Sequence, residues 1–378
     1  MTLDTAVVGG GIVSRVHLPG LAKSPLVDLV AVCDLDEERA REAARSYGIR
    51  AYFDVEELLA SESLDWLHVC TPVQSHRDVA IQAIEAGVPV LIEKPVTVTS
   101  EELADVEAAS REHDVPVSVV RNHLFSPEVA DARRRIAAGE LGDVRGVDVV
   151  YTGNTLPDET NRGSWAFELA GGEFEEGIPH PIYVGLGVGG VPADRDAVTV
   201  TTACHGDYEQ GFSFDGLGGQ WTTADEVLCS VKVMAGSVPQ RFVQVHGEDA
   251  SLLVDLVANT TVELDRNYTG SPKGRALNNV DHALDRVRGT VENAVGVARR
   301  SFASDWETEK YWEGHYRQYD LEAEALLLEE PSPISMEQVR WTVRMVELVR
   351  ERAEAGRRTD RDERVERVEQ SAASARDD

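Results

Sequence analysis

The amino-acid sequence predicts an α/β domain with a doubly wound parallel sheet, followed by an α+β domain with an open, mainly antiparallel sheet. Two patterns along the chain support this prediction. Strand and helix patterns alternate over roughly the first 120 residues with short connections, which is typical of a parallel sheet wrapped by helices. From about residue 122, stretches of alternating polar and apolar residues follow one another, as in antiparallel strands.

The elements of the first domain are expected within residues 1–121. The predicted strands are apolar runs at 3–8, 27–33, 65–70, 88–92 and 115–120. The predicted helices lie between these strands, at 34–48, 74–87 and 100–114. Gly48 and Gly87 suit the position just after a helix, and Ser100 suits an N-cap, so the local signals agree with the alternation.

The second domain is expected over residues 122–356. A predicted helix at 126–139 leads into a strand at 144–152, and further strands are expected within 196–216, 225–237 and 240–249. Helices are predicted at 278–300, 313–330 and 335–356, and the last of these is amphipathic and could pack back on the first domain. The charged segment 357–378 has no apolar periodicity, and we expect it to be a disordered tail.

Composition narrows the class of protein. The formal net charge is −30, which disfavours nucleic acid and anionic membranes as partners because phosphates would be repelled. Acidic surplus with arginine in place of lysine suits a salt-adapted surface, and an acidic interaction surface is the alternative. The start lacks a basic leader segment, no apolar run could span a membrane, and the four cysteines are widely separated. These features predict a cytoplasmic protein without a metal site.

A glycine-rich turn follows the first predicted strand and opens a helix. In "VVGGGIVSRVHLPG", Gly9 and Gly11 occupy the first two positions of the pattern G-x-G-x-x-G, and Ser14 occupies the third. The first glycine permits a tight turn, and the second lets backbone N–H groups approach a pyrophosphate at the helix N-terminus. Ile12 and Val13 belong to the same turn. The pattern predicts a dinucleotide site, with a glycine turn that binds no ligand as the alternative.

Asp34 stands at the end of the second predicted strand, 20 residues after Ser14. An acidic side chain at this place accepts hydrogen bonds from the ribose hydroxyls of NAD. The stretch "CDLDEE" would repel a 2′-phosphate and lacks an arginine to receive one. We therefore expect NAD rather than NADP, and note that Asp34 could also be a plain helix N-cap.

Two further strand ends should face the same crevice, because ligands of doubly wound sheets bind beyond the carboxyl ends of the strands. The first is "VCTPVQSH" (69–76), in which Thr71 offers a hydroxyl and Pro72 shapes the turn. His76 lies early in the next helix, either as a cofactor contact or as an ordinary helix-face histidine. These three residues are predicted to border the cofactor.

The second strand end is "LIEKPV" (91–96). Pro95 cannot donate to a sheet ladder, so it ends the strand and biases Lys94 to an extended conformation. Lys94 is one of only five lysines in the chain and would point to where a nicotinamide and a substrate meet. A surface lysine at a strand end is the alternative. Glu93 is grouped with Lys94 among the residues expected at the cofactor.

The combination "GGGIVSRVHLPGL", "VCTPVQSH" and "IEKP" resembles the oxidoreductase family of glucose–fructose oxidoreductase and inositol dehydrogenase. The three motifs span the first domain. The resemblance implies an NAD-binding Rossmann fold for residues 1–121. It also implies a second domain with an open, mainly antiparallel sheet that carries the substrate and commonly an oligomer contact.

The resemblance extends to a signature of the second domain, in which an acid and a histidine four residues later follow a glycine run. In "AGGEFEEGIPHPIY" (170–183), Glu176 and His180 match these positions, although the family usually has aspartate where Glu176 stands. Prolines on both sides of His180 argue against regular helix there. Asn122 matches a family position that often borders the substrate.

These residues fit the oxidation of a secondary alcohol. A histidine such as His180 suits removal of the hydroxyl proton near neutral pH. Lys94 would polarise the same oxygen and keep the histidine neutral by like-charge repulsion. Glu176 would orient the imidazole.

We therefore expect an NAD-dependent oxidoreductase acting on a sugar, sugar acid, nucleotide sugar or cyclic polyol. The alternatives are a glycoside hydrolase that uses bound NAD transiently and a non-catalytic NAD-binding regulatory protein. A homodimer or homotetramer is expected because an open sheet face needs covering. Trp165 and Trp221 could stack on a sugar, with core packing as the alternative.

Overall fold

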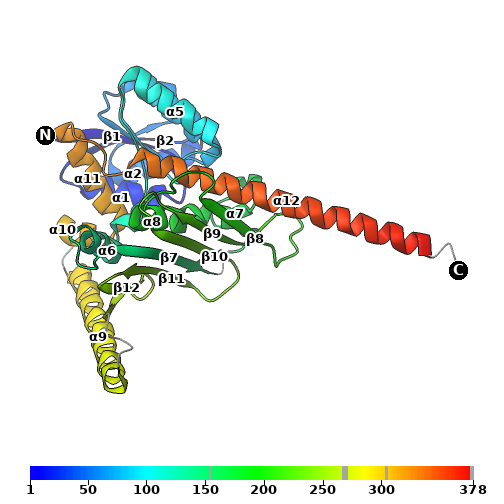
Figure 1. The fold of residues 1–378 in the computed structure, drawn as a ribbon. Helices are drawn as coiled ribbons and strands as arrows, with labels where there is room; N and C mark the ends of the chain where they lie inside the picture. The colour runs from blue at the N-terminus through cyan, green and yellow to red at the C-terminus, as the bar shows by residue number, and fades with distance from the viewer. Residues whose placement is uncertain (154, 266–270, 303–304, 375–378) are drawn as a thin grey trace.

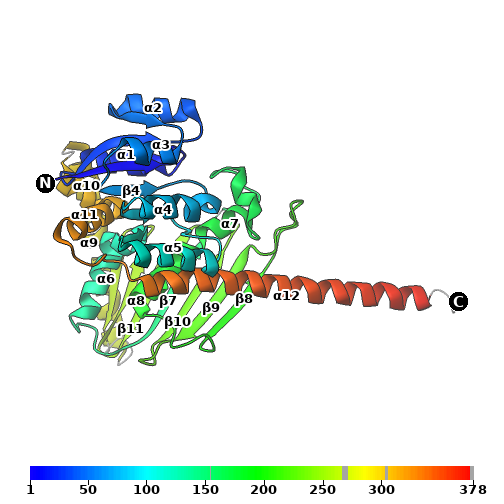
Figure 2. The same ribbon diagram turned by 90° about the horizontal axis from the view of Figure 1, so that it is seen from above.

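The computed structural model describes residues 1–153, 155–265, 271–302 and 305–374 and arranges them around two β-sheets (Figures 1 and 2). A six-stranded sheet is formed by the N-terminal part of the chain, and a seven-stranded sheet follows. Both predicted sheet types are therefore confirmed.

The first sheet is entirely parallel, and its strand order reverses beside the first strand. In order across the sheet, its strands are β3 (Arg50–Tyr52), β2 (Val27–Cys33), β1 (Leu3–Val8), β4 (Trp66–Val69), β5 (Val90–Ile92) and β6 (Val117–Val119). The three-residue strand β3 was not predicted. The chain moves outward from β1 to one edge and from β4 to the other, so the crevice expected in a doubly wound sheet lies between the carboxyl ends of β1 and β4.

Helices cover both faces of this sheet. Those contributed by the N-terminal part are α1 (Ser14–Lys23), α2 (Glu37–Tyr47), α3 (Val55–Ser61), α4 (His76–Glu85) and α5 (Ser100–His113). Leu21 of α1 packs in one buried cluster with Tyr319 of α11 (Gly314–Leu328), whereas Leu58 and Ile84 pack in the cluster on the opposite face. A helix from the C-terminal part thus completes the first layer, and a domain division at residue 121 stays a prediction.

The second sheet is mainly antiparallel, with one parallel pair between β7 and β10. Its strands in order are β13 (Thr260–Asp265), β12 (Ala250–Asp255), β11 (Gln240–Gly247), β7 (Val144–Thr152), β10 (Leu228–Met234), β9 (Gly216–Thr222) and β8 (Val198–Ala203). Helix α8 (Pro179–Gly189) packs on one face, between this sheet and the first domain (Figure 1). The opposite face carries exposed polar side chains such as Thr199, Gln220 and Lys232.

The remaining elements connect these layers. They are the 3₁₀ turns η1 (Val73–Ser75), η2 (Asn122–Phe125) and η3 (Ser164–Glu168), and the helices α6 (Pro127–Ala137), α7 (Gly172–Gly177), α9 (Pro272–Phe302), α10 (Trp306–Trp312) and α12 (Met336–Ser374). No helix among the described residues is both long enough and apolar enough to cross a membrane.

Helix α12 runs much further than predicted. It continues past residue 356 to Ser374, where a disordered tail was expected, and residues 375–378 lie outside the described part. Arg, Glu and Ala are strong helix formers, and a single interior glycine, Gly356, does not suffice to end the helix without a following proline. The helix also contacts the first domain, since the Ser100 backbone N–H donates to a carboxylate oxygen of Glu347 at 2.6 Å.

Trp221 belongs to the core and is not placed to stack on a sugar. It is 1% exposed, and its indole N–H donates to the Gly190 carbonyl at 2.9 Å. A Cβ at Gly185 of α8 would lie 2.7 Å from the indole ring, so this glycine allows the helix to approach the sheet.

We predict that Trp221→Ala lowers the free energy of unfolding by about 3–5 kcal/mol, because it leaves a large cavity beneath α8. Gln220→Ala, on the exposed face of the same strand, should change it by less than about 0.5 kcal/mol. Urea unfolding followed by circular dichroism measures both. Equal stability of the two variants would contradict this packing.

Candidate active site

The glycine turn has the conformation that a dinucleotide site requires. Gly9 has a φ of +103°, and its N–H donates to the Cys33 carbonyl at 2.8 Å, which turns the chain sharply after β1. A Cβ on Gly9 would lie 2.6 Å from the Cys70 carbonyl, whereas one on Gly11 would meet no atom within 4 Å. The space above Gly11 is therefore open.

The N-terminus of α1 lies at this opening. Val13 is the N-cap residue, no side chain caps the helix, and its first turn has no acidic residue. The predicted Ile12 is 47% exposed beside it. Backbone N–H groups at an uncapped helix N-terminus stabilise a phosphate, so these residues fit the pyrophosphate of NAD. The Ser14 hydroxyl donates to the Gly11 carbonyl at 2.6 Å and closes the turn.

Asp34 lies directly after β2 and faces the turn. One of its carboxylate oxygens accepts a hydrogen bond from the Gly10 N–H at 2.6 Å. Arg39, on the first turns of α2, lies 3.2 Å from the same oxygen and also pairs with Asp36. Arg39 follows directly after the stretch "CDLDEE" and was not among the predicted site residues. In the structure its charge is opposed by two carboxylates.

The loop after β4 is held by His76. Thr71 and Pro72 lead into the turn η1, and Thr71 accepts a hydrogen bond from the Ser75 hydroxyl at 2.9 Å. His76 is buried, with Nε2 2.7 Å from the Thr71 carbonyl and Nδ1 2.9 Å from the Pro95 carbonyl. Both ring nitrogens face the backbone, so His76 joins the two crevice loops. The structure gives it this positioning part, and its contact with the cofactor stays a prediction.

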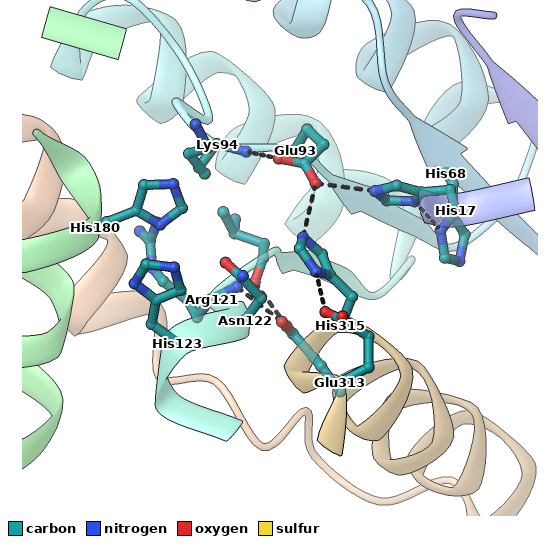
Figure 3. A network of polar contacts seen from close by, with 12 residues as sticks. His17, His68, Glu93, Lys94, Arg121, Asn122, His123, His180, Glu313 and His315 are labelled. Atoms are coloured by element: carbon teal, nitrogen blue, oxygen red, sulfur yellow. Dashed lines mark hydrogen bonds and ion pairs between the residues drawn. The ribbon is translucent and has the colours of Figure 1, made fainter. Parts of the chain in front are cut away.

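Glu93 is the centre of a buried charge network (Figure 3). Its carboxylate accepts hydrogen bonds from His17 Nε2 and from the Lys94 backbone N–H, both at 2.9 Å. Burial acts to raise the pKa of Glu93, but the hydrogen bond from His17 and the charge of Lys94 hold it at about 2. Glu93 is therefore an ionised anchor below the loop, and its contact with the cofactor stays a prediction.

The network extends away from the crevice through a second histidine. His17 Nδ1 lies 2.8 Å from His68 Nδ1, and His68 Nε2 is buried without a hydrogen-bond partner. Burial lowers the pKa of both rings. Because His17 donates from Nε2 to Glu93, a neutral His17 accepts at Nδ1 and His68 donates there. The network thus has a single consistent direction of donation that ends on Glu93.

Lys94 points from the end of the loop toward the second domain and is also buried. Its ammonium forms an ion pair with the Glu176 carboxylate and lies 3.4 Å from the Glu176 carbonyl oxygen. Glu176 additionally faces Arg162 at 3.7 Å. The loop is thereby anchored on two sides, through Glu93 to the first domain and through Lys94 to the second.

His180 lies in the first turn of α8, which begins at Pro179. The region predicted to be irregular is therefore helical, because proline is compatible with the first turn of a helix. His180 Nδ1 lies 2.7 Å from the hydroxyl of Tyr183, and that hydroxyl donates to the Asn122 side-chain oxygen at 2.9 Å. Since the hydroxyl has only one proton, Nδ1 of His180 must donate, which leaves the lone pair on Nε2.

The imidazole of His180 is held neutral. Burial lowers its pKa well below the usual value, and the positive charges of Lys94 and Arg241 lower it further. The ring of His123 stacks on it at 4.3 Å between centroids, and burial lowers the pKa of His123 to about 3 (Figure 3). A neutral ring with an available lone pair is able to accept a proton.

The predicted orienting role of Glu176 differs from what the structure shows. Among the described residues, the hydrogen-bond partner of His180 is Tyr183, three residues along the same helix, whereas Glu176 pairs with Lys94. Glu176 lies near the C-terminus of α7, which ends at Gly177, whereas His180 lies in α8, which begins at Pro179. The side chains of Glu176 and His180 therefore belong to different helices. The i to i+3 spacing of His180 and Tyr183 was a signal in the sequence that could have identified the partner.

Two further residues complete the crevice. Asn122, predicted to border the substrate, lies at η2 and holds the Tyr183 hydroxyl. Trp165 of η3 is half-buried, and its carbonyl accepts a hydrogen bond from Gln74 beside the Pro72 turn at 3.1 Å. The segment 155–170 therefore reaches the first domain through Trp165 and faces Glu176, the partner of Lys94, through Arg162.

The fold and the glycine turn define the N-terminal part as a Rossmann nucleotide-binding domain. Residues 3–121 match the family model described as "Oxidoreductase family, NAD-binding Rossmann fold", so this part of the chain is similar to that family. The resemblance to glucose–fructose oxidoreductase and inositol dehydrogenase is thus confirmed. NAD is the cofactor that this Rossmann fold binds.

Curated relatives are similar over the same part. D-apiose dehydrogenase from Paraburkholderia graminis is 33% identical over 138 residues, which cover 36% of this chain and 37% of that protein. The scyllo-inositol 2-dehydrogenase (NAD(+)) of Bacillus subtilis is 37% identical over 139 residues, covering 36% and 41%. The chain therefore spans about two fifths of the length of the curated relatives it matches.

Solved structures are similar over nearly the whole chain. An oxidoreductase from Agrobacterium radiobacter in complex with NAD+, L-tartaric acid and magnesium has a TM-score of 0.75 at 16% identity, covering 94% of this chain and 97% of that one. Levoglucosan dehydrogenase in complex with NADH has a TM-score of 0.74 at 17% identity, covering 94% and 98%. At these identities the similarity establishes the fold of both sheets.

Two glycine substitutions should separate folding from cofactor binding. Gly9→Ala forces a Cβ against the Cys70 carbonyl at a positive φ, so we predict a loss of about 1–3 kcal/mol in the free energy of unfolding. Gly11→Ala, facing open space, should fold normally but bind NAD roughly tenfold more weakly, because its Cβ occupies the place of the pyrophosphate. Chemical denaturation and calorimetric titration with NAD measure these effects. Unchanged NAD affinity in Gly11→Ala would contradict the assignment of the turn.

Proposed function

We propose that the protein is an NAD-dependent oxidoreductase that acts on a secondary hydroxyl of a sugar, sugar acid, nucleotide sugar or cyclic polyol. The observation that carries the proposal is the neutral His180 with its lone pair on Nε2, gathered with Lys94 at the carboxyl ends of the first sheet. Relatives of the first domain named as D-apiose and inositol dehydrogenases support the choice of substrate class.

NAD, when bound, supplies the acceptor for the hydride that leaves the carbinol carbon. The chain itself supplies the proton acceptor. His180 Nε2 takes the hydroxyl proton while the hydrogen bond from Nδ1 to Tyr183 steadies the imidazolium that forms. The Tyr183 hydroxyl is in turn fixed by Asn122, so the ring cannot rotate freely. In the reverse direction, the same nitrogen returns the proton to the oxygen.

Lys94 stabilises negative charge on the substrate oxygen. An ammonium has three N–H donors, and the carboxylate and the carbonyl of Glu176 occupy two of them. The third is available for the substrate oxygen, where it opposes the charge that develops as the proton leaves. Glu176 then acts as a positioning residue for Lys94, in place of the predicted role toward His180.

The reaction is tested by following NADH absorbance while sugars, sugar acids, nucleotide sugars and polyols are offered in turn with NAD. At least one of these compounds should reduce NAD to NADH. A chromogenic glycoside offered in the same buffer tests the alternative, because release of the chromophore without net NADH would indicate hydrolysis. NAD binding without turnover of either kind would support a non-catalytic binding protein and overturn the proposal.

With an active substrate, His180→Ala should lower kcat/KM by roughly 10²–10⁴-fold through loss of the base. Lys94→Ala should lower it by roughly 10²–10³-fold through loss of charge stabilisation. Matched controls are His246→Ala and Lys232→Ala, which alter the same residue types on the second sheet. Full turnover in His180→Ala or Lys94→Ala would overturn the roles given to them.

The pH profile is expected to reflect the lowered pKa of His180. A base whose pKa is lowered in the folded protein stays neutral as the pH falls through 6.5, so its acid limb moves to lower pH. We therefore predict that kcat/KM for alcohol oxidation remains on its plateau at pH 6.5. A limb at or above pH 6.5 that disappears in His180→Ala would show that the ring is not desolvated as described.

A further inference from the structure

Helix α9 lies on the edge of the second sheet and extends beyond it (yellow in Figure 1). One side of the helix faces the body of the protein. Asn293 donates to the carbonyls of Ala258 and Asn259 at 2.7 and 3.0 Å. A Cβ on Gly289 would lie 2.8 Å from Thr260, and one on Gly296 would overlap the Trp312 ring. Glycines and polar residues therefore form the docked side of this helix.

The opposite side of α9 carries a row of exposed hydrophobic side chains. The large ones are 55–59% exposed and are Leu277, Val280, Leu284, Val287 and Val291. Their spacing alternates between three and four residues, and the exposed Ala294 and Ala298 continue it for another turn. A repeat of 3.5 residues is the pattern with which one helix packs along another. We call these seven residues the α9 seam.

The seam contrasts with the rest of the second domain. The open face of the sheet carries polar side chains such as Thr199, Gln220 and Lys232. Leu228 on that face is 62% exposed, and an oligomer contact through the open sheet stays a prediction. Contiguous exposed hydrophobic surface marks an interaction site, and here it is found on α9.

We propose that the α9 seam pairs antiparallel with the α9 seam of a second copy of this chain, about a two-fold axis. The charges that flank the seam specify this partner. Asp281 and Arg288 lie along one edge, and Ala276, Ala283 and Thr290 lie along the other. In an antiparallel pair like edges meet, so Asp281 of each copy faces Arg288 of the other. In a parallel pair both charges would face alanine.

The same register aligns the hydrophobic layers. With Leu284 opposite Val287 of the second copy, Val280 comes opposite Val291 and Leu277 opposite Ala294. The small residues on the uncharged edge let the two backbones approach closely. Arg288 also pairs with Glu292 in its own helix, with both side chains mainly exposed, and such a surface pair contributes little and can exchange. Because the seam points away from the docked side, the two bodies lie on opposite sides of the helix pair.

An anionic membrane is the other surface that an amphipathic helix could cover. Membrane-bound helices carry basic residues beside the apolar face. One edge of the α9 seam has Asp281 and Arg288, and the other edge has no charged residue beside the apolar row. These flanking charges favour pairing with a copy of the chain over binding to a membrane.

The full chain should be a dimer in size-exclusion chromatography with light scattering. Val287→Glu places two carboxylates at the centre of the pair, so we expect the dimer Kd to rise by roughly 100-fold or more. Asn279→Glu adds the same charge to α9 outside the seam and should change the Kd by less than about twofold. Position 287 is exposed in the single chain, and circular dichroism will verify that both variants fold.

A charge exchange tests the antiparallel register. Asp281→Arg and Arg288→Asp should each weaken the dimer by roughly tenfold, because each brings like charges together twice. The double variant should recover the wild-type Kd, and an equimolar mixture of the two single variants should form heterodimers.

Three outcomes would overturn the proposal. They are a monomer at every concentration, a dimer unaffected by Val287→Glu, and a monomer that instead sediments with phosphatidylserine vesicles. A dimer that is weakened by Val287→Glu but insensitive to the charge exchange would overturn the antiparallel register. None of these measurements depends on catalytic activity, so they are independent of the proposed function.

Discussion

The crevice depends on two opposite charges, at residues 93 and 94, that are buried side by side. A buried charge is tolerated only with a partner, and each of these two takes its partner from a different part of the fold. Glu93 is held by His17 of α1, and Lys94 is held by Glu176 of α7. The loop that carries Glu93 and Lys94 is thereby fixed to a helix of each domain. This arrangement explains why a buried strand ends with an acid and a lysine directly before a proline.

The same burial sets the chemistry of the histidines. His180 and His123 are half-buried, and desolvation together with nearby cations lowers the pKa of both rings, so both are neutral where a solvent-exposed histidine would be partly charged. Tyr183 then decides which nitrogen of His180 carries the proton, because its own proton is committed to Asn122. Desolvation therefore keeps His180 neutral, and the Tyr183 hydroxyl leaves the lone pair on its Nε2. The proposed oxidation depends on this arrangement.

The acidic surface and the α9 seam have opposite effects on association. A net charge of −30 repels a second copy at long range, and salt screens that repulsion within about 10 Å at moderate ionic strength. The seam acts only at contact, where hydrophobic burial is largely independent of salt. A chain of this composition can thus remain well dispersed and still form one specific pair through a helix that projects beyond its charged body.

The sequence by itself determined the local features: both sheet types, the bounds of β1, β2 and β7, and the glycine turn. Apolar periodicity, glycine and proline signal these through neighbouring residues alone. The tertiary structure decided that Glu176 pairs with Lys94 and that His76 and Glu93 anchor loops. Those partners are chosen by burial between elements up to 82 residues apart, and no short pattern in a chain specifies which buried groups will meet.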